Sequence, residues 1–353
     1  MFRGFGLSHS RRRFLGMGIA AAIAPTLLNA CTSSKQASPG TASPAGGGTR
    51  AIKFSHGSGL CNMPLFYSSE KKLFEKYGFS GATALTPLNA DIAAQLATGQ
   101  VEMAVIPFTN AIAAYTQGAP FQVVAGSGVQ GLIVVAKPEI KTFQDLKDKK
   151  VGTFQADTLD IIVYDYLKEN GMDYKDVNMV YFGDSTEMLN AYLAGQVDCI
   201  SSIEPYATKA KTATNGNILG DGVDLYGAYY PDCVLAARNE WVQNEPELVK
   251  NVIRTFFEAQ YEIENNFEEA AKTTVGKYYK TDLESLLQAA QAQPPGVDIR
   301  DKKDFMYSRA DSMLALNYIN KQPDENFVNF TLLEEVIKES PELWDRVKVK
   351  ASV

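Results

Sequence analysis

Residues 96–102 read LATGQVE, and residues 192–198 repeat the pattern as YLAGQVD. In each stretch a helical pattern ends at a glycine, Gly99 or Gly195, and an acidic residue then leads into an apolar strand. Glycine is favoured just past a helix end because it adopts the left-handed backbone conformation without a steric penalty. The two corners are 96 residues apart and predict two lobes of one architecture rather than one continuous sheet.

Outward from these corners, short apolar stretches alternate with helical patterns, which is typical of an α/β fold with mostly parallel sheets. Strands are predicted at 51–54, 101–106, 132–136, 151–154, 179–182 and 197–203. Helices are predicted at 64–77, 158–169 and 187–193, with another that starts at Asn89 or Asp91 and ends at Gly99. Beyond residue 245 the pattern is mostly helical, at 246–265, 267–279, 283–292, 303–318 and 331–337.

These late helices need a lobe surface on which to bury their apolar sides. The simplest arrangement returns the chain to the first lobe after the second is complete. We therefore expect lobe 1 to comprise 51–135 and 236–353, and lobe 2 to comprise 136–235. Two crossing strands, near 132–137 and 233–238, would form a hinge that permits closure.

The N-terminus has the features of an export and anchoring signal. Residues 10–16, SRRRFLG, resemble a twin-arginine motif, and the uncharged apolar stretch 17–28 is too short to span a bilayer. Leu28-Asn29-Ala30-Cys31 resembles a lipobox, so lipidation is predicted at Cys31, although a plain secretory signal cut nearby is the alternative. Residues 32–50, rich in Ser, Thr, Gly, Ala and Pro, would form a flexible tether of roughly 25 Å reach. The expected location is the membrane surface, facing the periplasm or the cell exterior.

Charge and cysteine content exclude several classes of function. Residues 1–31 contain four of the 34 basic residues and none of the 41 acidic ones, so the mature net charge would be −11. Such a chain is a poor partner for nucleic acid, and no second apolar run is long enough to span a membrane. No His/Cys cluster has metal-ligand spacing, so we expect no metal, no cofactor and no catalytic residue.

The cysteines of the mature chain are Cys61, Cys199 and Cys233, besides Cys31. Twin-arginine export usually carries chains that have already folded in the cytoplasm, so disulfides are not needed for folding. Three cysteines also cannot all pair with one another. We therefore expect no disulfide framework, with a Cys199–Cys233 bridge left open. Cys61 is interpreted as a small apolar cap of a first helical turn rather than as a reactive thiol. The protein is expected to be a monomer.

Three segments carry a family resemblance. They are MPLFY at 63–67 with LFEKYGF at 73–79, LIVVA at 132–136 with FQDLKDKKVG at 143–152, and LAGQVD at 193–198 with IEPY at 203–206. Together they resemble the substrate-binding proteins of ABC importers for nitrate, sulfonates, taurine and thiamine precursors. The resemblance implies a type II periplasmic-binding fold, two lobes that close over a small molecule, and a permease with its ATPase as partner.

In such folds ligands bind at the carboxyl ends of strands, where helix N-termini meet the cleft. The residues predicted to bind ligand are Ser58, Asn62, Asn89, Phe108, Thr109, Asn110, Gln155, Asp157, Thr158, Asp184, Glu204, Tyr206 and Tyr230. Tyr229 and Asp232 are further candidates. Helix capping is the alternative for Asn89, Asp91, Asp157 and Ser185, and core packing is the alternative for Phe108, Tyr206, Tyr229 and Tyr230. Glu204 with Pro205 could also be only a strand stop, and His56 is interpreted as a loop or cleft-edge residue rather than as a catalyst.

The predicted cleft is acidic. The turn TFQADTLD at 153–160 places a carboxylate at a helix start, Glu204 adds another, and no predicted cleft loop contains an arginine. An anion would be repelled there, so the interpretation favours an amine-bearing ligand such as a pyrimidine of the thiamine-precursor type. Taurine or another alkanesulfonate, or nitrate, is the alternative within the family. A pyrimidine-synthase-like enzyme, disfavoured by the single mature histidine, and a ligand-sensing lipoprotein are the alternatives of other classes.

Overall fold

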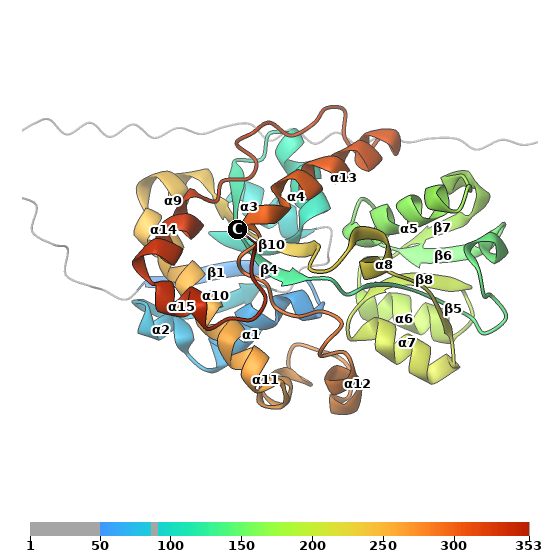
Figure 1. Ribbon diagram of the computed structural model, residues 1–353, viewed down its shortest axis with the longest axis horizontal. Helices are drawn as coiled ribbons and strands as arrows, with labels where there is room; N and C mark the ends of the chain where they lie inside the picture. Colours follow the sequence, from blue (N-terminus) through green and yellow to red (C-terminus); the bar gives the residue numbers. More distant parts are fainter. Residues whose placement is uncertain (1–49, 86–90, 353) are drawn as a thin grey trace, which may run out of the picture. The chain divides into compact units, whose positions relative to one another are not determined.

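The computed structural model describes residues 50–85 and 91–352, and it contains two five-stranded sheets (Figure 1). The first has the order β2-β1-β3-β10-β4 and the second β7-β6-β8-β5-β9. The first sheet consists of β1 (Arg50–His56), β2 (Phe79–Leu85), β3 (Met103–Pro107), β4 (Phe121–Val129) and β10 (Pro231–Arg238). The second consists of β5 (Leu132–Ala136), β6 (Lys150–Thr153), β7 (Asn178–Tyr181), β8 (Cys199–Ile203) and β9 (Asn217–Asp221).

The two sheets are built alike. In each, three parallel strands are followed by one that pairs antiparallel on both sides, β10 in the first sheet and β5 in the second. The repeated corners occupy equivalent places, directly before β3 and β8, and Gly99 and Gly195 are both left-handed, with φ of 78° and 72°. The predicted α/β fold of two similar lobes is confirmed. The sheets are mixed rather than mostly parallel as predicted, because β10 and β5 run antiparallel to both of their neighbours.

The helices that are not packed around the second sheet come from both ends of the described chain. They are α1 (Met63–Glu70), α2 (Leu73–Lys76), α3 (Ile92–Thr98), α4 (Phe108–Thr116), α9 (Asn239–Asn244), α10 (Pro246–Asn265), α11 (Phe267–Thr274), α12 (Leu283–Gln288), α13 (Lys303–Ala315), α14 (Thr331–Glu339) and α15 (Pro341–Asp345). Two of them, α12 and α13, also contact helices of the second sheet. Helix α10 begins at Pro246, as predicted, and contributes the fully buried Phe256, whose ring centroid lies 6.4 Å from that of Phe54. Each buried side chain of this size stabilises the fold by about 1.5–3 kcal/mol.

Helices α5 (Thr158–Glu169), α6 (Ser185–Leu193) and α7 (Tyr206–Thr214) surround the second sheet, and α8 (Gly222–Tyr226) follows β9 (Figure 1). Helix α5 spans the predicted residues because Asp157 caps it by accepting a hydrogen bond from the Leu159 amide. The first predicted helix is instead divided into α1 and α2, because Lys72 has a left-handed backbone with φ of 57°. No helix among the described residues is long and apolar enough to cross a membrane.

The chain passes between the lobes at two short connections. Strand β5, expected mostly in lobe 1, lies wholly in the second sheet, and β10 lies wholly in the first. The crossings therefore fall at Gln130–Gly131 and near Gly227–Tyr230, where several residues have positive φ. The Gln130 amide donates to the Tyr230 carbonyl at 2.8 Å, and the Tyr230 hydroxyl accepts from the Leu132 amide at 3.0 Å. The two crossing segments are thus joined by hydrogen bonds.

Candidate functional site

Polar contacts join the two lobes directly. The Leu60 amide donates to the Glu204 carbonyl at 2.9 Å, and the Ser58 and Ser185 hydroxyls lie 2.8 Å apart. Thr158 Oγ1 donates to the Asp232 carboxylate at 2.7 Å, and Asn110 Nδ2 donates to the Ala156 carbonyl at 3.3 Å. The approach is so close that a Cβ at Gly59 would collide with Ile203. The lobes are therefore in contact around the site.

Between these contacts lies a cavity of about 10 Å³, close to the volume that one water molecule requires. The predicted residues Ser58, Asn62 and Asp157 line it, and so do Cys61, Asp232 and Cys233. Asn62 also holds the loop after β1, because its Oδ1 accepts from the Gly57 amide at 3.2 Å and its Nδ2 donates to the Gly59 carbonyl at 3.1 Å. Both lobes thus contribute to one small site, in which polar groups lie beside apolar side chains such as Phe154, Leu159 and Ile203.

A second small cavity is aromatic. Four predicted residues line it, namely Phe108, Thr109, Thr158 and Tyr230. Phe305 of α13 also lines it, with its ring centroid 5.9 Å from that of Phe108 and 5.1 Å from that of Tyr226. Arg309 lies in the same wall, and its guanidinium is paired with Asp165. The Thr109 hydroxyl is buried without a hydrogen-bond partner among the described residues. Thr158 lines this cavity while it donates to Asp232 of the first, so the two cavities are adjacent.

Asp232 is the most constrained carboxylate of the site. Its side chain is 1% exposed and accepts hydrogen bonds from Thr158 and from Gln293 Nε2 at 2.7 Å. Burial raises the pKa of Asp232 to about 8; the Asp157 charge adds to this, and the two hydrogen bonds oppose it. Two carboxylates and no lysine or arginine are among the described residues that line the first cavity.

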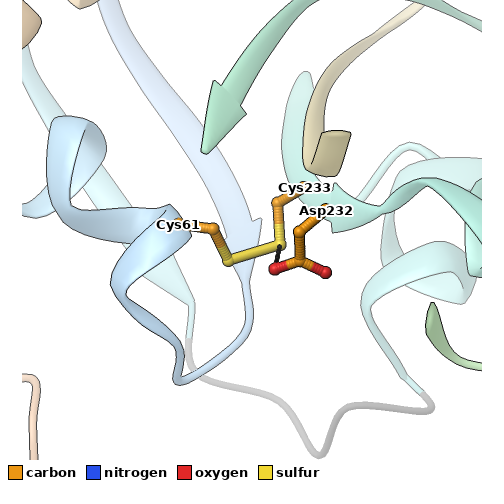
Figure 2. A group of neighbouring side chains, drawn as sticks. All are labelled: Cys61, Asp232 and Cys233. Atoms are coloured by element: carbon orange, nitrogen blue, oxygen red, sulfur yellow. Dashed lines mark hydrogen bonds between the residues drawn. A yellow bond between two sulfur atoms is a disulfide. The ribbon is translucent and has the colours of Figure 1, made fainter. Parts of the chain in front are cut away.

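Cys61 and Cys233 form a disulfide beside Asp232, with Cα atoms 5.7 Å apart (Figure 2). The expectation of no disulfide is wrong, and so is the Cys199–Cys233 alternative, because Cys199 is a free buried thiol on β8. The short helix η1 (Leu60–Asn62), which contains Cys61, packs directly on β4, where a Cβ at Gly128 would collide with Cys61. That approach brings Cys61 to β10, the neighbour of β4 in the sheet.

Glu204, Tyr206 and Asp184 do not line either cavity. Both carboxylate oxygens of Glu204 accept from Thr208 of its own lobe, from the amide at 3.1 Å and the hydroxyl at 2.9 Å. Burial raises the pKa of Glu204 to about 7. Tyr206 is buried in the core of the second lobe, and Asp184 caps α6 by accepting from the Thr186 and Glu187 amides.

The remaining predicted positions lie farther out. Asn110 and Gln155 line an open surface hollow, and Asn110 joins the lobes through its bond to Ala156. Tyr229 is 45% exposed. Asn89 lies outside the described residues. Sequence reasoning missed the paired cysteines and Gln293, which is distant in sequence and 2% exposed; no local pattern indicates that Gln293 reaches Asp232.

Comparison with known proteins agrees with this architecture. A protein of Brucella abortus that is described, by inference, as a binding protein is 28% identical to this chain over 221 residues. These residues cover 62% of this chain and 68% of that protein. The nitrate-binding protein of Synechocystis has a TM-score of 0.74 at 17% identity, over 86% of this chain and 92% of that one. The aliphatic-sulfonate-binding protein of Escherichia coli has a TM-score of 0.66 at 19% identity, over 78% and 90%.

These solved structures share the type II periplasmic-binding fold with this protein, and at such identities the likeness concerns the fold alone. The model of the NMT1-like family matches residues 46–276, which is more than half of the sequence and includes both crossings between the lobes and the whole second sheet. The chain therefore belongs to the NMT1-like family.

Proposed function

We propose that this protein is the extracytoplasmic solute-binding component of an ABC importer and that it captures a small amine-bearing molecule between its lobes. The family match and the two-lobed fold support a binding role. Direct contacts around an enclosed cavity are what closure over a small ligand requires. The proposed partners are the importer's permease and its ATPase.

The observation that carries the ligand class is the pair Asp157 and Asp232 in one cavity without a basic side chain among its described lining. Asp232 keeps its proton in the unliganded protein, and the charge of a protonated amine would favour its ionised form and pair with it. An anion would find no positive side chain among the described residues of this lining. The adjacent aromatic cavity, with Phe108, Tyr230 and Phe305, offers ring faces to a planar heterocycle. The residues that line the two cavities therefore match a pyrimidine-like amine in their chemistry. Because each cavity holds about 10 Å³, close to the volume that one water molecule requires, the lobes would separate to admit such a ligand.

A sulfonate or nitrate is the second candidate, because a protein of Escherichia coli named for inferred binding of aliphatic sulfonates is 28% identical over 130 residues. That match covers 36% of this chain and 39% of that protein. An anion would need the free amides of a helix N-terminus. At α5 the Leu159 amide already donates to Asp157, so the carboxylate occupies the place that such an anion would take.

Thermal unfolding of residues 50–353 with candidate ligands tests the ligand class. A ligand present at about 100 times its dissociation constant adds roughly 2.7 kcal/mol to the free energy of unfolding, which raises the melting temperature measurably. Aminopyrimidines should raise it, and nitrate and alkanesulfonates should not. A rise with sulfonates alone would contradict the amine proposal while retaining a binding role.

The proposed location rests on the sequence, since residues 1–49 lie outside the described part of the chain. Export through the twin-arginine-like signal and lipidation of Cys31 would hold the folded lobes near the membrane on the tether 32–50. Cys31→Ser should move the protein from the membrane fraction to the soluble fraction. Retention of the variant in membranes would contradict the lipid anchor.

A further inference from the structure

Three atoms of the types that bind metal ions meet in the first cavity. The Sγ atoms of Cys61 and Cys233 and a carboxylate oxygen of Asp232 all lie within 4.8 Å of one another, and all three residues are buried (Figure 2). No spacing rule reveals this group, because Cys61 is far from the other two in sequence. The three residues meet because η1, which contains Cys61, packs on β4, and β10, which contains Asp232 and Cys233, lies beside β4 in the first sheet.

The local backbone directs two neighbouring side chains to the same place. Consecutive residues of a regular strand point to opposite faces, yet Asp232 and Cys233 both reach this cavity. Register shifts interrupt the pairing of β10 with β4 between Pro231 and Cys233 and again between Cys233 and Val234. Such irregularities redirect side chains and are common beside functional sites.

The third residue, Cys61, is fixed from the other side. Ser127 Oγ of β4 donates to the Cys61 carbonyl at 2.6 Å, and Gly128 leaves room for η1 to pack on the strand. Asp232 in turn is oriented by two neutral donors, Thr158 and Gln293. Hydrogen bonds of this kind hold a carboxylate in the orientation that a metal ligand requires.

The donor set is selective. Two thiolates and one carboxylate suit a thiophilic divalent ion such as Zn²⁺, whereas Mg²⁺ and Ca²⁺ prefer oxygen alone. With Zn–S bonds of about 2.3 Å, tetrahedral geometry places sulfur ligands about 3.8 Å apart. The three observed atoms lie within 4.8 Å of one another, so the group is already confined to a region of about that size. Three protein ligands leave one position of a tetrahedral ion for another ligand.

We propose that Cys61, Cys233 and Asp232 form a binding site for a thiophilic divalent cation, open when the two cysteines are reduced and closed when they form the disulfide. A dithiol reductant supplies two electrons and two protons, becomes a disulfide itself, and converts the Cys61–Cys233 bond to two thiols. The cation then displaces the two thiol protons to solvent. Reoxidation by a disulfide oxidant reverses the step and releases the cation.

Titration of the purified mature protein with Cd²⁺ and Co²⁺ tests this site without any organic ligand. Reduced protein should bind one ion, with the thiolate-to-metal charge-transfer absorption that identifies sulfur ligands. The same protein with its disulfide intact should show no such band. Absence of the band in the reduced protein, or an equal band in the oxidised protein, would overturn the proposal.

Matched variants identify the ligands. Cys61→Ser and Cys233→Ser should each abolish the two-thiolate band, and Asp232→Asn should weaken affinity by at least about tenfold. Cys199→Ser is the control, because Cys199 is a buried thiol of the second sheet and should leave binding unchanged. Loss of the band in Cys199→Ser, or its retention in Cys61→Ser, would contradict the assignment.

A measurement on the unaltered chain guards against variants that fail to fold. Cd²⁺ should raise the melting temperature of the reduced protein and leave that of the oxidised protein unchanged, because the ion binds only the folded, reduced form. Equal melting temperatures of the reduced protein with and without the ion would overturn the proposal. Because no solute is present, this result is independent of whether the protein serves an importer.

Discussion

Two buried carboxylates, Asp232 on the crossing side of lobe 1 and Glu204 at the end of β8 in lobe 2, are both 1% exposed, yet their surroundings differ. Glu204 is held by the backbone and side chain of one nearby residue, Thr208. Asp232 is held by Thr158 from the other lobe and by Gln293 from a distant segment. The hydrogen bonds of Glu204 stabilise only the start of α7 in its own lobe. The hydrogen bond between Thr158 and Asp232 joins the two lobes and would break if the lobes separated.

The largest expected effect is that of Asp232→Asn on binding of an amine-bearing ligand. Removing one partner of a buried charge pair typically costs roughly 2–5 kcal/mol, so affinity should fall by that amount in isothermal titration calorimetry. Asp224→Asn, an exposed acid of α8, is the matched control and should bind as the wild type does. Equal affinity of Asp232→Asn and wild type would remove Asp232 from the ligand site.

The next effect is the pH dependence of stability. Because the pKa values of Asp232 and Glu204 are raised to about 8 and about 7, the folded state keeps protons that the unfolded state releases. Each group therefore stabilises the fold at low pH, and this stability is lost as pH rises from about 4 towards the folded pKa, by up to about 1.4 kcal/mol per pH unit.

Urea unfolding of wild type and Asp232→Asn at several pH values checks this. The variant cannot ionise at position 232, so its stability should fall less steeply between about pH 5 and 8. Contributions from the other groups cancel in the difference between the two proteins. Parallel curves would show that the Asp232 carboxylate is not protonated in the folded state.

The smallest expected effect is that of Glu204→Gln on ligand affinity. Since its oxygens are engaged by Thr208 and the side chain lines neither cavity, the change should stay within about 0.5 kcal/mol. Stability should fall by about 1 kcal/mol through the weakened hydrogen bonds. A loss of affinity as large as that of Asp232→Asn would break the distinction between the two carboxylates.

Local signals explain which elements could be predicted. Helices α5 and α10 were located to the residue because a capping Asp157 and an N-terminal Pro246 mark their starts. Strands β2, β4 and β9 were missed because FSGATAL, FQVVAGSGV and NILGD contain glycines and polar residues that weaken a strand pattern. The glycine of β4 that matters most, Gly128, is required by packing with η1, which no local pattern shows.

Part of the lining of the two cavities was predictable for the same reason. Turns at the carboxyl ends of strands gave Ser58, Asn62, Asp157 and Thr158, all of which line the two cavities. Glu204 could have been interpreted as a cap, because a threonine follows it four residues later. The pairing of Cys61 with Cys233 depends on the packing of η1 on β4 and on β10 lying beside that strand, and is a tertiary fact.

The disulfide also sets the covalent topology of the protein. It joins residues separated by 172 positions, and the entire second sheet with both crossings lies between them. Oxidised, the polypeptide is a closed ring with two tails, and the ring contains the whole of lobe 2. A protease that cuts one loop of that lobe would open the ring without releasing a fragment. A ring of this size also lowers the conformational entropy of the unfolded chain. In the chain-entropy account this stabilises the folded state by about 5 kcal/mol.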